Sequence, residues 1–314
     1  LQPEDKVWTV LRGLKSVSPT TEFNFVDQGW DPRNMSQAKV DEAVEAAKNS
    51  DLNIVCCGEY MMRFRWNDRT SGEDTDRDNL ELVGLQEQLI RRLNETGKPT
   101  IVIIISGRPL SVRYAAEKVP AIINAWEPGQ FGGQAIAEIL YGKVNPSAKL
   151  AMTIPRHVGQ ISTWYNHKRS AFFHPAVCAD NTPLYPFGYG LSYTTFRYSD
   201  LKLSAPSIPN DGKTPIIARV TVENTGHRDG IEICQLYIND IVSSVARPVK
   251  ELKDFRRVAL KAGEKQTIEF SITPDKLAAY NLDMKLEVEP GAFEVLVGGS
   301  SSDNDLQKAT FKVE

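Results

Sequence analysis

The hydrophobic pattern of this chain changes its period about two thirds of the way along. Up to about residue 145, short apolar runs alternate with segments in which apolar residues recur with helical spacing. From about Tyr198 onward, apolar residues instead recur at every second position. Side chains alternate across a strand but recur every 3.6 residues along a helix. The first part therefore predicts an α/β fold and the last part an all-β fold.

The first part predicts a doubly wound, mostly parallel sheet with right-handed crossovers. Thr100 to Ile105 is an unbroken run of β-branched residues, which is typical of a strand covered on both faces. The other expected strands are 22–26, 52–57 and 121–125, and the expected helices are 7–14, 37–48, 83–93 and 132–141. No strand precedes helix 7–14, and the chain starts at Leu1 without a signal peptide. We therefore expect a processed or trimmed chain, or a second chain that completes the sheet.

The second part predicts a small β-sandwich. Alternating segments at 216–222, 233–238, 249–258, 266–272 and 293–297 are separated by short stretches of turn residues. Residues 156–197 are rich in Pro, Tyr, Phe, His and Gly, and predict a long connector packed on the α/β domain. The expected domains are thus 1–155 for the α/β part, 156–197 for the connector and 198–314 for the sandwich.

Composition excludes several classes of partner. The formal net charge is −3 and the isoelectric point is about 5.9, with no dominant basic tract, so nucleic acid and anionic membranes are not expected to bind. No apolar run is long enough to span a membrane. The cysteines lack metal-binding spacing and are expected to be free and buried: Cys56, Cys57, Cys178 and Cys234. Cys56 and Cys57 are neighbours in a strand pattern, so they should point to opposite faces.

One charged segment is a candidate for chemistry. Residues 71–80 carry one Glu, three Asp and one Arg between the strand at 52–57 and an apolar helical pattern. In open parallel sheets, ligands bind at the carboxyl ends of the strands. A carboxylic acid on such a loop could act as a general acid or base. The alternative is a solvated charged loop that caps the helix.

Several short motifs follow one another in a distinctive order. They are Ser-Gly-Arg-Pro at 106–109, Ala-Trp-Glu-Pro-Gly-Gln at 125–130, Gly-Lys-Val-Asn-Pro-Ser-Ala-Lys-Leu at 142–150, Ile-Pro-Arg-His at 154–157, Leu-Tyr-Pro-Phe-Gly-Tyr-Gly-Leu-Ser-Tyr at 184–193 and Asn-Thr-Gly at 224–226. With this series the chain resembles the C-terminal half of glycoside hydrolase family 3 enzymes, the β-glucosidase and β-xylosidase group. The resemblance implies an α/β sandwich domain followed by an immunoglobulin- or fibronectin III-like sandwich. The family's nucleophile is an Asp on a (β/α)8 barrel, for which this chain has no candidate.

The resemblance also implies a catalytic role for the charged segment. Residues 71–77, Ser-Gly-Glu-Asp-Thr-Asp-Arg, match the family's acid/base loop, with Glu73 as general acid/base of a retaining glycosidase. Asp74 departs from the pattern, because many relatives carry Gly there. Glu59, directly after the strand at 52–57, is a second acid/base candidate, and its alternative role is to anchor a loop.

Three further residues are expected to contact the substrate. Trp66 could stack on a leaving-group sugar, or pack its loop against the barrel. Arg77 could contact a sugar hydroxyl, or pair with Glu73 or Asp76 to hold the loop in shape. Asp76 is the third expected substrate contact.

We therefore expect the C-terminal portion of a retaining β-glucosidase-type hydrolase acting on terminal non-reducing β-linked glucose or xylose, without cofactor or metal. Its partners would be a β-linked oligosaccharide or glycoside and an N-terminal barrel of the same enzyme, and a homodimer stays open. The isolated chain should be inactive, and the resemblance favours a periplasmic or extracellular location. The alternative is a non-catalytic carbohydrate-binding or interaction module.

Overall fold

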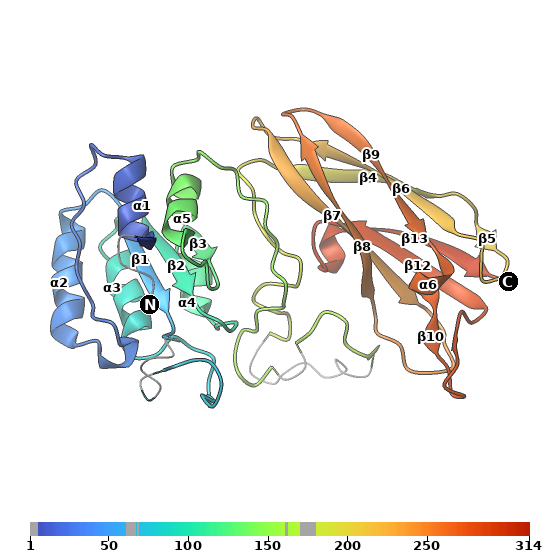
Figure 1. Cartoon of the computed structure of the whole chain (residues 1–314), viewed down its shortest axis with the longest axis horizontal. Helices are drawn as coiled ribbons and strands as arrows, with labels where there is room; N and C mark the ends of the chain where they lie inside the picture. The colour runs from blue at the N-terminus through green and yellow to red at the C-terminus, as the bar shows by residue number, and fades with distance from the viewer. Residues whose placement is uncertain (1–5, 61–66, 68, 161–162, 170–179) are drawn as a thin grey trace. The chain divides into compact units, whose positions relative to one another are not determined.

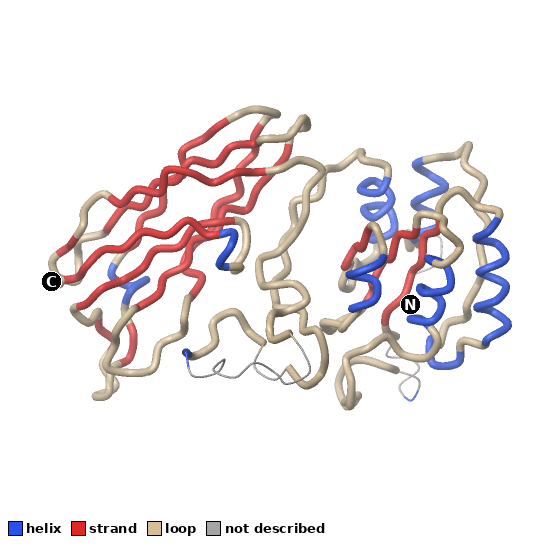
Figure 2. The backbone as a smooth tube through the Cα atoms, turned by 180° about the vertical axis from the view of Figure 1, so that it is seen from behind, coloured by secondary structure: helices blue, strands red, loops and turns tan. Residues whose placement is uncertain are grey.

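The computed structural model of the chain describes residues 6–60, 67, 69–160, 163–169 and 180–314. These residues form two compact units (Figures 1 and 2). The first unit comprises residues 1–144 and 154–161, and the second comprises residues 145–153 and 162–314. No helix of the described residues is long and apolar enough to cross a membrane.

The first unit is built on a parallel sheet with the strand order β1-β2-β3. Its strands are β1 (Asn53–Gly58), β2 (Thr100–Ile105) and β3 (Ala121–Asn124). Its helices are α1 (Val10–Val17), η2 (Pro32–Asn34), α2 (Gln37–Lys48), α3 (Gln86–Asn94), α4 (Arg113–Lys118) and α5 (Gly132–Leu140). Each strand is followed by a helix, as the parallel sheet requires. The predicted α/β class is confirmed.

Local sequence explains how several of these elements form. β2 spans the β-branched run, and its Val102 and Ile103 are fully buried, as expected for a central strand. The hydroxyl of Ser36 accepts a hydrogen bond from the backbone N–H of Lys39 at 3.3 Å and so caps the start of α2. In α3, Leu89 and Leu93 are both buried.

Two expectations for the first unit are wrong. Residues 22–26 form no strand, and Phe25 is 66% exposed, because an alternating pattern becomes a strand only where a neighbouring strand pairs with it. Cys56 is exposed rather than buried, whereas Cys57 is buried. The two thiols do lie on opposite faces of β1, and burial raises the pKa of the Cys57 thiol. Cys178 lies outside the described residues.

The second unit is a β-sandwich. One sheet has the order β5-β13-β12-β7-β8 and the other the order β4-β6-β9. The strands are β4 (Phe196–Leu203), β5 (Ser207–Ile208), β6 (Ile216–Asn224), β7 (Gly230–Asp240), β8 (Glu251–Leu260), β9 (Lys265–Ile272), β12 (Gly291–Gly298) and β13 (Leu306–Val313), with a hairpin of β10 (Ala279–Tyr280) and β11 (Leu286–Glu287) and the short helices α6 (Pro274–Leu277) and η5 (Asp303–Asp305). Alternate side chains of both sheets fill the core, including Phe270, Phe293 and Phe311. The predicted sandwich is confirmed.

The connector from residue 162 onward belongs to the second unit rather than to the α/β unit on which it was expected to pack. The ring of Tyr165 stacks on Phe187 at a centroid distance of 4.3 Å and meets the edge of Tyr237 at 5.7 Å. Its hydroxyl accepts a hydrogen bond from the N–H of Leu252 at 3.1 Å. Aromatic side chains with one polar group therefore attach this connector to β7 and β8.

Candidate functional site

The loops that leave the three strands of the parallel sheet are joined to one another at its carboxyl edge. The N–H of Glu59, just after β1, donates to the carbonyl of Ile105 at the end of β2, at 3.0 Å. The N–H of Ser106, just after β2, donates to the carbonyl of Trp126 beyond β3, at 3.2 Å. This edge therefore brings together residues that are far apart in the sequence, as expected for a ligand-binding edge of an open α/β sheet.

The side chain of Glu59 is fully buried at this edge, with 0% of its surface exposed. Its Oε1 accepts a hydrogen bond from Nη1 of Arg77 at 2.6 Å. Its Oε2 lies 3.0 Å from Nε of Arg108 and 3.0 Å from the hydroxyl of Ser106. One buried carboxylate thus forms ion pairs with two guanidinium groups, and both of its oxygens are occupied.

Arg77 uses its remaining donors within its own segment. Its Nη2 donates to Oδ1 of Asn79 at 2.7 Å and to the carbonyl of Glu81 at 2.8 Å. The expected pairing of Arg77 with Glu73 or Asp76 is wrong, because its carboxylate partner is Glu59. A carboxylate that is shielded from water needs a cationic partner, whereas exposed carboxylates are solvated.

Arg108 links the same carboxylate to the charged segment. Its Nη2 donates to the carbonyl of Thr75 at 3.0 Å while its Nε faces Glu59. Ser106, which is 1% exposed, accepts a hydrogen bond from the N–H of Arg108 at 3.2 Å and so supports the start of this loop. From the sequence, the Ser-Gly-Arg-Pro motif contributed only to the family resemblance, and no role was assigned to Arg108. The signal that was available is its position directly after a strand adjacent to β1.

Glu73 lies at the exposed tip of a tight turn. The N–H of Thr75 donates to the carbonyl of Gly72 at 3.2 Å, and the hydroxyl of Thr75 donates to the same oxygen. Asp74 occupies the left-handed region at φ = 57°, a conformation that glycine adopts without steric cost. The backbone explains why Gly suits this position, and it shows that Asp can adopt the same turn.

The chain that leads into this turn is buried. Arg69, Thr70 and Ser71 are 7%, 6% and 2% exposed. The N–H of Thr70 donates to the carbonyl of Tyr60 at 2.9 Å, and the N–H of Tyr60 donates to the hydroxyl of Thr70 at 2.8 Å. An exposed carboxylate therefore stands on a stem whose backbone is hydrogen-bonded to the end of β1.

The other predicted site residues are placed as follows. Asp76 is exposed on the same segment, two residues beyond Asp74. Trp66 lies outside the described residues. Among the residues that the structure describes, no group of three or more His, Cys, Asp and Glu side chains could hold a metal ion.

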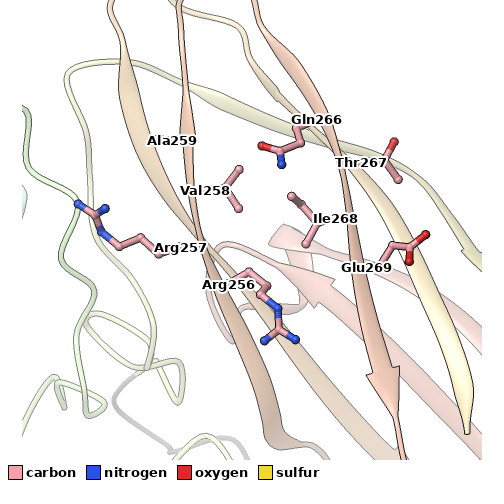
Figure 3. A pocket seen from close by; sticks show the side chains of 8 residues that line it. All are labelled: Arg256, Arg257, Val258, Ala259, Gln266, Thr267, Ile268 and Glu269. Carbon is pink, nitrogen blue, oxygen red and sulfur yellow. The ribbon is translucent and has the colours of Figure 1, made fainter.

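A groove on the sandwich offers different chemistry. It has a volume of about 530 Å³ and is lined by β8 and β9, the edge strands of the two sheets (Figure 3). The guanidinium of Arg256 lies 5.3 Å from the ring centroid of Phe270, a cation–π arrangement. The carboxylate that lines this groove, Glu269, is ion-paired with Arg219. A lone paired carboxylate does not supply the two carboxyl groups of glycoside hydrolysis.

Comparison with known protein families identifies both units. The glycosyl hydrolase family 3 C-terminal domain matches residues 3–193, and the fibronectin type III-like domain matches residues 232–301. A β-xylosidase of Formosa agariphila is 41% identical over 311 residues, which cover 98% of this chain and 42% of that protein. A periplasmic β-glucosidase of Salmonella typhimurium is 41% identical over 286 residues, which cover 87% of this chain and 36% of that protein.

Solved structures show the same arrangement of elements. A β-glucosidase of Erythrobacter marinus matches with a TM-score of 0.87 and 36% identity, covering 99% of this chain and 44% of that one. A β-glucosidase of Listeria innocua in complex with isofagomine matches with a TM-score of 0.87 and 32% identity, covering 99% of this chain and 43% of that one. The chain thus spans about two fifths of the length of these relatives. It belongs to glycosyl hydrolase family 3 and comprises the family's C-terminal α/β domain followed by a fibronectin type III-like domain.

Proposed function

We propose that this chain supplies the general acid/base of a retaining β-glycosidase, with Glu73 in that role. The nucleophile and the main sugar pocket would lie on a (β/α)8 barrel of the same enzyme. The observation that carries the proposal is an exposed Glu73 on a turn whose stem is buried and tied to the carboxyl edge of the sheet. A carboxyl group held in this way can be presented to a substrate on another domain.

The surroundings of Glu59 favour Glu73 over that second candidate. Oε1 of Glu59 accepts a hydrogen bond from Arg77, Oε2 is ion-paired with Arg108 and accepts a hydrogen bond from Ser106, and the side chain is shielded from solvent. A general acid must reach the glycosidic oxygen with a free carboxyl oxygen. Glu73 meets this requirement, because its side chain lies on the exposed turn.

The chemistry has two steps in which Glu73 moves a proton. As the glycosidic C–O bond breaks, Glu73 donates its proton to the leaving oxygen while the nucleophile bonds to the anomeric carbon. Glu73, now a carboxylate, then accepts a proton from the water that attacks the glycosyl-enzyme. Relatives named β-glucosidase and β-xylosidase support terminal β-linked glucose or xylose as substrates. A relative named as periplasmic supports a periplasmic or extracellular location.

Glu73→Gln in the complete enzyme tests the proposal. Turnover of glycosides with poorly acidic leaving groups should fall by about 10²–10⁴-fold, because their departure requires protonation. With aryl glycosides whose phenols are acidic, the rate of the first step should fall much less, so the glycosyl-enzyme should accumulate. Azide, which attacks without losing a proton, should then restore their turnover and release a glycosyl azide.

Asp78→Asn is the matched control, because it removes another exposed carboxylate of the same segment. It should leave the dependence on the leaving group unchanged. Equal losses for all leaving groups in Glu73→Gln, without azide rescue, would contradict the assignment. Glycan binding without any effect of Glu73→Gln on hydrolysis would instead support a non-catalytic binding module.

The isolated chain should not turn over aryl glucosides or xylosides, because a retaining mechanism needs two carboxyl groups about 5–5.5 Å apart. Glu59 cannot serve as the second one while both its oxygens bind arginine. Activity that persists in the chain, after mass analysis shows no barrel-containing polypeptide, would contradict this expectation.

A further inference from the structure

We infer that Glu59 is a positioning residue for Glu73: its buried carboxylate, acting through Arg108 and Arg77, holds the acid/base turn in place. The inference rests on the proposed function of Glu73. It assigns to Glu59 a part in catalysis that does not require contact with the substrate.

The first connection runs through Arg108. Oε2 of Glu59 lies 3.0 Å from Nε of Arg108, and Nη2 of the same guanidinium donates to the carbonyl of Thr75 at 3.0 Å. Thr75 is the residue whose N–H and hydroxyl close the turn on Gly72. A single side chain therefore joins the buried carboxylate to the turn that carries Glu73.

The second connection runs through Arg77. This side chain is 11% exposed and donates to Oε1 of Glu59 at 2.6 Å. Its other terminal nitrogen holds Asn79 and the carbonyl of Glu81 at 2.7 and 2.8 Å. The arm that follows the turn is thus fixed at Thr75 by one arginine and from position 77 to 81 by the other.

The arm that precedes the turn returns to the same place. Thr70 donates its N–H to the carbonyl of Tyr60, and its hydroxyl accepts from the N–H of Tyr60. Tyr60 is the direct neighbour of Glu59. Both arms of the Glu73 turn therefore end at Glu59 and Tyr60, just beyond β1. A displacement at this point would move the turn as a unit.

Charge explains why a carboxylate is needed there. Loss of the charge would leave two guanidinium groups close together without compensation in a site shielded from water. Glutamine keeps an acceptor oxygen at only one of the two terminal positions, and its NH₂ group at the other position would face a donor. At least one arginine must then withdraw, and the turn loses an anchor. Misplacement of a catalytic group by about 1 Å can cost about 10²-fold in rate.

Glu59→Gln in the complete enzyme tests the inference with the same series of leaving groups. We expect kcat to fall about 10²-fold for poorly acidic leaving groups and clearly less for acidic phenols. A role limited to stability would lower activity equally across the series. Glu59→Asp, which keeps the charge, should recover part of the loss.

Glu232→Gln is the control for loss of a buried charge. Glu232 lies in the sandwich unit, and its side chain is 5% exposed and ion-paired with Lys149 at 3.2 Å. We expect its substitution to affect thermal unfolding without changing the dependence on the leaving group. If Glu59→Gln does not fold, Arg108→Lys serves instead, because lysine cannot reach both Glu59 and Thr75 with a planar fork.

The outcomes separate the two proposals. Suppose that the loss of activity in Glu73→Gln depends on the leaving group, whereas Glu59→Gln and Arg108→Lys reduce turnover of all substrates equally or not at all. The positioning role of Glu59 is then refuted and the acid/base role of Glu73 stands. If Glu73→Gln shows no such dependence, the acid/base role itself fails. If activity in the Glu59 and Arg108 variants falls with the same dependence on the leaving group as in Glu73→Gln, but to a smaller extent, the inference is supported.

Discussion

Alanine at position 13 should destabilise the α/β unit, because α1 and α5 meet there backbone to backbone. A Cβ atom on Gly13 would lie 2.1 Å from the carbonyl oxygen of Gly133 and 3.1 Å from Cβ of Ala137. The segment that precedes α1 is also hydrogen-bonded to the residues around the start of α5. The N–H of Gly133 donates to the carbonyl of Trp8 at 3.0 Å, and the N–H of Trp8 donates to the carbonyl of Gln130 at 2.9 Å.

The magnitude follows from the size of the overlap. Non-bonded heavy atoms are comfortable at about 3.5 Å, so relieving the 2.1 Å contact requires the two helices to separate by about 1.4 Å. Overpacking costs about 1–3 kcal/mol, and we take the upper end because the obstacle is backbone that cannot rotate away. Alanine returns about 1 kcal/mol through its helix propensity. The net loss is about 2 kcal/mol, or about 4–8 °C in the melting temperature of a unit of this size.

Differential scanning calorimetry of Gly13→Ala should show a lower melting temperature for the α/β unit and an unchanged transition for the sandwich. Lys15→Ala, at an exposed position of the same helix, is the control and should change stability by less than about 0.5 kcal/mol. A melting temperature equal to or above that of the unaltered chain would refute the close contact between α1 and α5. The helix propensity of alanine would then be the dominant effect.

Three other substitutions test separate features. At Asp74, glycine should be more stable than alanine by about 1 kcal/mol in urea unfolding, and the reverse order would contradict the left-handed backbone. Hydrogen bonds from Arg33 and its charge lower the pKa of Asp31 in the folded state. Ionised Asp31 therefore stabilises the fold at pH values above its pKa in the unfolded state, and this contribution is lost as pH falls through its pKa in the folded state. Asp31→Asn should therefore flatten the acid limb of a stability–pH profile. An unchanged acid limb would contradict a stabilising ion pair between Asp31 and Arg33. Asn224→Ala should lower the free energy of unfolding of the sandwich by about 3 kcal/mol, because it leaves Thr194 and other buried groups without their hydrogen-bond partner. A decrease of less than about 1 kcal/mol would contradict this role of Asn224.

Local pattern was sufficient where neighbouring residues decide the structure. The β-branched run at 100–105 became a strand with the predicted bounds, and Ser36 capped α2 because its hydroxyl is adjacent to free N–H groups. The same reasoning failed for residues 22–26, whose alternation lacks a pairing strand. It also missed β4 and β13, whose exposed faces carry many charged residues. Pairing partners are a property of the fold and cannot be seen in a short window of sequence.

The sequence by itself determined the fold class, the family and the charged loop that carries Glu73, because periodicity, turn residues and motif order are all local or linear properties. Only the tertiary structure decided the partners of Glu59. Arg77 is 18 residues away and Ser106 is 47 residues away, and several other acidic residues lie closer to Arg77 in sequence. The parallel sheet brings the ends of β1 and β2 together, and burial selects which carboxylate must be paired with arginine. Exposed carboxylates such as Glu73 are solvated and need no cationic partner.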